Sequence, residues 1–339
     1  MNAIPGRQVP RLLDALLGGH VVFAPVRHGR IVAFEPIASG SDAVLGCSNS
    51  TVSPRHVLLP RMETLLTSCS GDACARECTC PDSPVVLFGS RPCDARALTL
   101  LDRILSGGAN RDVYYQRRRD LLTIVSIGCA RPLETCFCTA MGGGPFSTDG
   151  SDILLEECEG SFLVHVVTER GRALASKLGV CDAGRRPGGA TAAAEEETGH
   201  PAAPTGIDPG MLKGSLDASF DDPVWRAISE RCIGCGICSY VCPSCHCFDI
   251  VDEEAGGSAC RKRVWDSCQF ASFTEQASGF NPRPTGASRY RQRIMHKFSY
   301  CIDDYGMAGC VGCGRCVTEC PVNLDIREVL KAFAARGAL

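Results

Sequence analysis

The sequence predicts two folded parts: an α/β or α+β domain in the N-terminal half and an α-helical, cysteine-rich domain in the C-terminal half. Two observations carry this prediction. Strand-like and helix-like patterns alternate through the first 180 residues. Two closely similar cysteine motifs follow later in the chain. Because a stretch rich in Ala, Gly, Pro and Glu separates these parts, we expect domains at 1–180 and 215–339 and a flexible linker at 181–214.

Length and composition are those of an ordinary globular chain, except for the cysteines. The 339 residues suffice for about two domains with their own cores. The chain contains 24 cysteines and has a formal net charge of −3, which gives no support to nucleic-acid binding. No N-terminal segment has the pattern of a signal peptide, and no apolar run is long enough for a membrane helix. We therefore expect a cytoplasmic protein that does not insert into the membrane directly.

The first elements are predicted to be a helix and a hairpin. Residues 9–17 place four leucines on one face of a helix. Residues 21–37 contain two strand-like runs around a turn at His28 and Gly29, which is typical of a β-hairpin.

A strand, a turn and a helix are predicted over residues 84–105. Asp94 lies where a helix N-terminus favours an acidic cap, and Cys93 lies beside that positive end, where a thiolate is stabilised. A second strand at 121–127 leads to Cys129. Strand pairs at 153–155 and 162–167 and a helix at 171–178 complete this half.

Four N-terminal cysteines are candidates for one site, because sites collect at the ends of strands in an open α/β sheet. They are Cys93, Cys129, Cys136 and Cys138. Four thiols suffice for an iron–sulfur cluster. A zinc site, a redox dithiol and plain buried cysteines are the alternatives. A further group, Cys69, Cys74, Cys78 and Cys80, has irregular spacing, and metal binding there is a separate hypothesis.

The C-terminal half contains two motifs with the spacing C-x2-C-x2-C-x3-C-P, at 232–243 and 310–321. In this spacing three thiolates hold one 4Fe-4S cluster and the fourth ligates the other cluster. The spacing therefore assigns Cys232, Cys235, Cys238 and Cys320 to one cluster, and Cys310, Cys313, Cys316 and Cys242 to the other. The N-terminal cysteines would then hold a third cluster.

The segment between the motifs is predicted to be helical. Helices are expected at 220–231, 267–277 and 288–300, which would make this an α-helical ferredoxin-like domain with two 4Fe-4S clusters. Additional residues follow the first motif, and one of them can replace Cys242 as a ligand: Cys245, His246, Cys247, Cys260 and Cys268.

A basic run occupies this segment between the two motifs. It can raise the reduction potential of a cluster, meet an acidic partner, or form a solvated helix face. Its residues are Arg283, Arg289, Arg291, Arg293, His296 and Lys297.

The chain resembles a known family, the 4Fe-4S β subunits of sulfhydrogenases and the A-type subunit of anaerobic sulfite reductase. The resemblance covers both halves and is carried by FGSRPCDARAL (88–98), CARPLETCFCTAMGGGPFS (129–147), CIGCGICSYVCPSCHCFDI (232–250), WDSCQFASF (265–273), RYRQRIMHKF (289–298) and CVGCGRCVTECP (310–321). It implies an electron-transfer subunit between a flavin subunit that oxidises NAD(P)H and a catalytic subunit.

The sequence thus favours an iron–sulfur electron-transfer subunit of a cytoplasmic, anaerobic oxidoreductase complex. No general base, nucleophile or substrate pocket is evident, so catalysis and the flavin are expected on partner subunits. One alternative is a flavin- or thiol-dependent oxidoreductase whose N-terminal Cys93 or Cys136 performs the chemistry. Another is an iron–sulfur redox sensor, which predicts a DNA-binding element.

Overall fold

A seven-stranded mixed sheet organises the N-terminal half of the computed structural model, which describes residues 3–69, 76–77, 82–184, 207 and 209–335. The strand order is β1-β9-β8-β7-β6-β2-β3, and the four strands β2, β6, β7 and β8 run parallel. The strands are β1 Ala3–Pro5, β2 Val21–His28, β3 Ile31–Pro36, β6 Val85–Ser90, β7 Leu122–Ile127, β8 Ile153–Cys158 and β9 Ser161–Val166.

Helices cover both faces of this sheet. The helices are α1 Val9–Leu17, α2 Pro92–Leu105, α3 Val113–Leu121 and α4 Glu169–Lys177. Leu13 of α1 and Leu174 of α4 pack with one set of strand residues, whereas Leu101 of α2 and Tyr115 of α3 pack with the set on the other face. This three-layer arrangement confirms the predicted α/β character, as well as the helix at 9–17, the hairpin after it and the strand–turn–helix over residues 84–105.

The C-terminal half contains a helical core and a β-hairpin. Its helices are α6 Pro209–Ala218, α7 Val224–Ser229, α8 Ile237–Tyr240, α9 Gly286–Met295, α10 Cys301–Tyr305, α11 Arg315–Thr318 and α12 Ile326–Ala334. Between α9 and α10 the helix passes through a π turn at His296–Tyr300. The core packs Leu216, Trp225, Ile294, Phe298 and Leu330 together. No helix in the described parts of the chain is both long and apolar enough to cross a bilayer.

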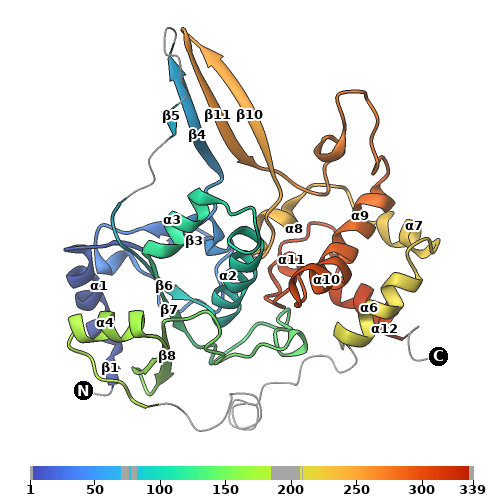
Figure 1. The fold of residues 1–339 in the computed structure, drawn as a ribbon. Helices are drawn as coiled ribbons and strands as arrows, with labels where there is room; N and C mark the ends of the chain where they lie inside the picture. The colour runs from blue at the N-terminus through green and yellow to red at the C-terminus, as the bar shows by residue number, and fades with distance from the viewer. Residues whose placement is uncertain (1–2, 70–75, 78–81, 185–206, 208, 336–339) are drawn as a thin grey trace.

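A second sheet corrects the prediction of a purely α-helical C-terminal domain. Its strand order is β10-β11-β4-β5, with β10 Phe248–Ala255, β11 Ser258–Trp265, β4 Met62–Cys69 and β5 Arg76–Glu77. The hairpin of β10 and β11 thus pairs with a strand from the N-terminal half, and the four strands project from the molecule as an arm (Figure 1).

The helix predicted at 267–277 is also wrong, since this stretch contains only a single 3-10 turn at Ser272–Thr274. The reason is that its polar groups bond to other segments instead of forming a helical ladder. The Gln269 side chain donates to the carbonyl of Arg289 at 3.1 Å, and the Arg289 guanidinium donates to the Gln269 carbonyl at 3.0 Å. The stretch therefore lies against the first cysteine motif as an irregular loop, with Gln269 and Phe270 in contact with it.

Candidate metal centres

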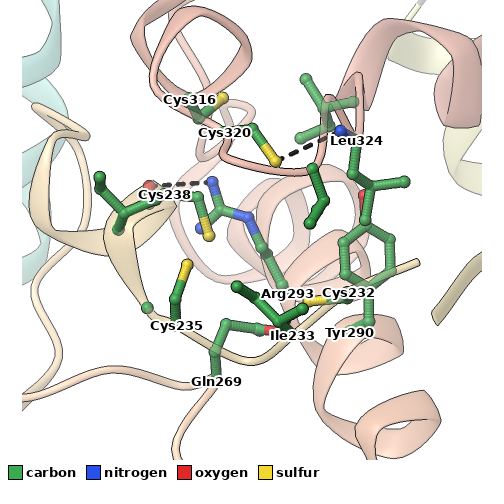
Figure 2. A pocket seen from close by; sticks show the side chains of 14 residues that line it. Cys232, Ile233, Cys235, Cys238, Gln269, Tyr290, Arg293, Cys316, Cys320 and Leu324 are labelled. Carbon is green, nitrogen blue, oxygen red and sulfur yellow. Dashed lines mark hydrogen bonds between the residues drawn. The ribbon is translucent and has the colours of Figure 1, made fainter. Parts of the chain in front are cut away.

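The first cysteine motif and the end of the second meet in one cavity (Figure 2). Cys232, Cys235, Cys238 and Cys320 line it, with their sulfur atoms in its wall. The short helix α8 carries Cys238, and the backbone N–H of Leu324 donates to Cys320 Sγ at 3.2 Å. The fold therefore gathers the four thiols that the spacing assigns to the first cluster.

A second cavity gathers the other four thiols. Cys242, Cys310, Cys313 and Cys316 line it. The backbone N–H of Gly312 donates to Cys310 Sγ at 3.4 Å, the kind of hydrogen bond that tunes cluster ligands. The two cavities together have the reciprocal arrangement that the paired motifs predict.

The alternative ligands after the first motif lie elsewhere. None of the five lines either cavity: Cys245, His246, Cys247, Cys260 and Cys268. Cys245 is hydrogen bonded to the thiol of Cys242, so it lies beside the second site rather than in it. This geometry favours Cys242 as the fourth ligand of the second cluster.

A third cavity brings together the four N-terminal cysteines. Cys93 lies in the first turn of α2, Cys129 follows the end of β7, and Cys136 and Cys138 come from the loop after it. Cys313 of the second motif also lines this cavity. Strands β6 and β7 are parallel neighbours, so the segments that follow them reach the same edge of the sheet, as the sequence predicts.

These N-terminal thiols are partly accessible, yet their surroundings oppose ionisation in the absence of a cation. Burial raises the pKa of Cys129 to about 12 and that of Cys138 to about 11. At Cys93, burial and then the nearby Asp94 carboxylate raise the pKa well above its usual value, which opposes the stabilisation expected from the helix N-terminus. Bound iron would supply the positive charge that deprotonated ligands require.

The thiols are spread around their cavities rather than focused on one point. In the described parts of the chain, no group of three or more His, Cys, Asp or Glu side chains forms a site for a single metal ion. A 4Fe-4S cluster accepts such a spread, because each of its irons takes a different thiolate. The donor sets therefore suit iron–sulfur clusters better than the zinc site that the sequence left open for the N-terminal cysteines.

Two buried cations lie against the two C-terminal sites, and both belong to the basic run. Arg293 and Lys297 are each only 4% exposed. The Arg293 guanidinium lies 3.8 Å from Cys245 Sγ and donates to the Cys238 carbonyl at 3.1 Å, while Lys297 Nζ lies 3.5 Å from Cys242 Sγ. The other members of the run are partly exposed, including Arg291, which stacks on the ring of Phe220.

These two cations have thiolates for counter-charges. Within the described residues, neither Arg293 nor Lys297 forms an ion pair with a carboxylate. Burial opposes the charge of Lys297, yet the neighbouring sulfur of Cys242, and then that of Cys245, outweigh burial and raise its pKa. Because an uncompensated buried charge is costly, the anionic clusters that the donor sets fit would also balance these side chains.

The sequence did not reveal the buried ion pair that joins the second motif to the N-terminal half. Arg315, from the second motif, donates to both carboxylate oxygens of Asp94 at 2.6 and 2.9 Å, and both side chains are almost fully buried. Asp94 also accepts from the Arg91 backbone N–H, as the predicted cap requires. The one signal for Arg315 in the sequence is its position as a charged residue between two cluster cysteines.

The irregular group near the end of β4 lies outside the described side chains. This holds for Cys69, Cys74, Cys78 and Cys80, and metal binding there stays a hypothesis. Most of the predicted linker at 181–214 also lies outside the described residues.

Comparisons with known proteins point in the same direction as the donor sets. A family model described as a 4Fe-4S dicluster domain matches residues 231–324. The chain is 31% identical to the sulfhydrogenase 2 subunit beta of Pyrococcus furiosus over 311 residues, which is 91% of each chain. It is also 26% identical over 146 residues to D-2-hydroxyglutarate dehydrogenase of Pseudomonas putida, but this match spans only 38% of the chain and 14% of that enzyme. No solved structure is a significant match.

Proposed function

This chain belongs to the sulfhydrogenase β-subunit family, and on that basis we propose that it is the iron–sulfur electron-transfer subunit of a cytoplasmic oxidoreductase complex. Its partners would be a flavin subunit that oxidises NAD(P)H and a catalytic subunit. When bound, 4Fe-4S clusters supply one-electron transfer. The side chains of this chain hold the clusters, exclude water from them and adjust their potentials.

The observation that carries the proposal is that the three cysteine sites lie in a row. Cys313 lines both the N-terminal site and the second site. Cys316 and Arg293 line both the second site and the first. The second site is therefore the middle member of a continuous series, which is the arrangement that an electron relay needs.

The first site is the end of the series closest to solvent. Cys235 is exposed and Ile233, two residues before it, is 65% exposed, whereas the middle site is lined by the buried Cys242 and Cys313. We expect one partner subunit to exchange electrons at this end. The N-terminal site, with Leu133 on the nearby surface, would be the other end.

The alternative of an N-terminal active site gains little from the geometry. The N-terminal half contains an open cavity of about 640 Å³, which is bordered by Phe23, Phe34, His56 and Arg118. No cysteine lines this cavity. Cys93 and Cys136 instead face the other cysteines of the third site, so the thiols and the space for a substrate are in different places.

Metal analysis of the full chain, purified anaerobically, tests the proposal. We expect about twelve irons and matching sulfide per chain, because each of three clusters contains four irons. Cys93→Ala should reduce this to about eight, whereas Cys158→Ala, which removes an exposed thiol at the end of β8, should leave it unchanged. Flavin should be absent from the isolated chain.

Other results would contradict specific parts of the proposal. About eight irons in both wild type and Cys93→Ala would confine the clusters to the C-terminal half and remove the third member of the relay. Stoichiometric zinc with Cys93-dependent binding would make the N-terminal site structural. Stoichiometric flavin would favour the chain as an enzyme in its own right.

A further inference from the structure

Several cysteines of the C-terminal half take no part in the three sites. Cys245, Cys247, Cys260 and Cys268 line none of the three cavities. Cys260 lies within the arm, opposite Glu253 in the strand pairing. Cys247, by contrast, immediately precedes β10, and Cys268 follows the end of β11. Both therefore lie at the base of the arm.

Strand pairing brings these last two cysteines together. The ladder of β10 and β11 ends with Phe248 opposite Trp265, and it is extended by the hydrogen bond from the Asp266 N–H to the Cys247 carbonyl at 3.1 Å. Cys268 follows two residues later, and its side chain is in hydrogen-bonding contact with the Cys247 thiol. Both side chains are partly accessible to solvent.

The two sulfur atoms have different surroundings. The Gln269 side-chain amide donates to Cys268 Sγ at 3.5 Å, and the Ser239 hydroxyl lies 3.7 Å from the same atom. The contact with Cys247, together with the charge of Arg293, lowers the pKa of Cys268, whereas the hydrogen bond to Cys268 raises the pKa of Cys247. An attacking thiolate beside a thiol is the pairing that thiol–disulfide exchange uses.

We propose that Cys247 and Cys268 form a redox-active dithiol that exchanges with disulfide substrates. The Cys268 thiolate attacks one sulfur of a disulfide RSSR, so the S–S bond breaks, RS⁻ leaves and a mixed disulfide forms. The Cys247 thiol then loses its proton and attacks Cys268 Sγ, which releases the second RS⁻. The pair gives up two electrons, the substrate gains them, and the proton of Cys247 is taken up by a released thiolate.

The position of the pair suits a two-electron site beside a one-electron relay. Ser239, which contacts Cys268, lies on α8 directly after Cys238 of the first site. The proposal nevertheless stands apart from the proposed function, because it depends only on the two thiols and not on the number of clusters.

Equilibration of the full-length, anaerobic protein with mixtures of glutathione and glutathione disulfide tests this site. After alkylation, peptide mass spectrometry should detect a Cys247–Cys268 crosslink that increases as the mixture becomes more oxidising. The fraction crosslinked should follow a two-electron curve, with a tenfold change in the ratio of disulfide to dithiol for every ~30 mV.

Three variants sharpen the test. Cys247→Ser and Cys268→Ser should each abolish the crosslink and leave the iron content of the wild type unchanged. Cys260→Ser, a matched change in the same hairpin, should retain the crosslink. If either serine variant folds poorly, the crosslink in the wild type decides the question alone.

Two outcomes would overturn the proposal. One is that both cysteines of the wild type are alkylated singly across the whole range of glutathione mixtures. The other is that Cys247→Ser and Cys268→Ser each lose about four irons while their circular dichroism is unchanged, since the two residues would then be ligands of a further cluster. Neither outcome depends on whether Cys93 binds iron, so failure here and failure of the proposed relay are distinguishable.

Discussion

Individual residues were predictable where their chemistry leaves a local pattern. The spacing of the two motifs was enough to sort eight cysteines into two sets of four. Each set lines one cavity, although Cys316 of the second set also lines the cavity of the first. The partners of Lys297 and Arg315 were not predictable, because a basic side chain in sequence does not show whether it faces solvent or a buried thiolate. Both are among the most buried charged residues of the protein.

Replacement of Lys297 should shift the potential of the cluster at the second site. A positive charge favours the reduced, more negative cluster, so Lys297→Met should lower the midpoint potential. The expected shift is roughly 100 mV. It corresponds to a Coulomb energy of about 2.5 kcal/mol between the Lys297 ammonium and the added electron, at an effective dielectric constant of ~20. Redox titration followed by electron paramagnetic resonance measures it.

Two further variants serve as controls for that measurement. Lys297→Arg keeps the charge and should keep most of the potential. Lys331→Met removes an exposed lysine from α12 and should leave the potential unchanged. An unaltered potential in Lys297→Met would show that Lys297 only supports the fold.

At the scale of elements, helices with a periodic apolar pattern were predicted well, whereas strands that pair with distant segments of the chain were not. Helix α1 has the bounds that its leucine pattern predicts, and α9 was expected as part of a longer helix. That helix continues as a π turn at His296–Tyr300, a feature that often marks functional sites and here contains Lys297. Strands β4, β10 and β11 were missed, because their pairing joins distant segments and their alternating charges resemble a solvated loop.

The loop of the second motif packs so closely on the N-terminal half that it requires a glycine. Gly312 has φ +66°, and a Cβ there would lie 2.5 Å from the carbonyl carbon of Phe137. Gly312→Ala should therefore lower the free energy of unfolding by more than the ~1–2 kcal/mol that a left-handed backbone alone costs an alanine. Anaerobic thermal unfolding, with iron content measured in parallel, provides the test.

Gly29 offers a matched control for this substitution. It has φ +60° but nothing within 4 Å of the position of its Cβ, so Gly29→Ala carries the backbone strain without the clash. Equal losses of stability in Gly29→Ala and Gly312→Ala would mean that the close approach of the loop to Phe137 has no energetic role.

At the scale of the whole molecule, the sequence predicted two parts but not how closely they are joined. The N-terminal site is completed by Cys313 of the second motif, and the Phe137 N–H donates to the Gly312 carbonyl at 2.8 Å. Arg55, from the N-terminal half, stacks on Trp265, with its guanidinium carbon 3.6 Å from the ring centroid. Such contacts have no local signature, because each depends on two segments that are far apart in the chain.

The buried pair of Arg315 and Asp94 should be a main link between the halves. Arg315→Met leaves the Asp94 carboxylate buried without its partner, which typically costs about 3–5 kcal/mol. The double variant Arg315→Met, Asp94→Leu should recover part of this loss, since no unpaired charge remains. Anaerobic thermal or denaturant unfolding of the two variants distinguishes these effects.

Arg172→Met serves as the comparison for the ion pair. Its pair with Glu169 is largely exposed, so its loss should cost less than about 1 kcal/mol. If Arg315→Met were no more destabilising than Arg172→Met, the halves would have to be held together mainly by their other contacts.

Because the sheet of the arm combines strands from both halves, it cannot be completed until late in the synthesis of the chain. β4 is synthesised about 190 residues before β11, the strand that covers its edge. At ~5–20 residues per second, a ribosome needs roughly 10–40 s to make the intervening chain. During this interval the edge of β4 is open to pairing with other nascent chains, so the N-terminal half depends on the late hairpin, or on a chaperone, for protection from aggregation.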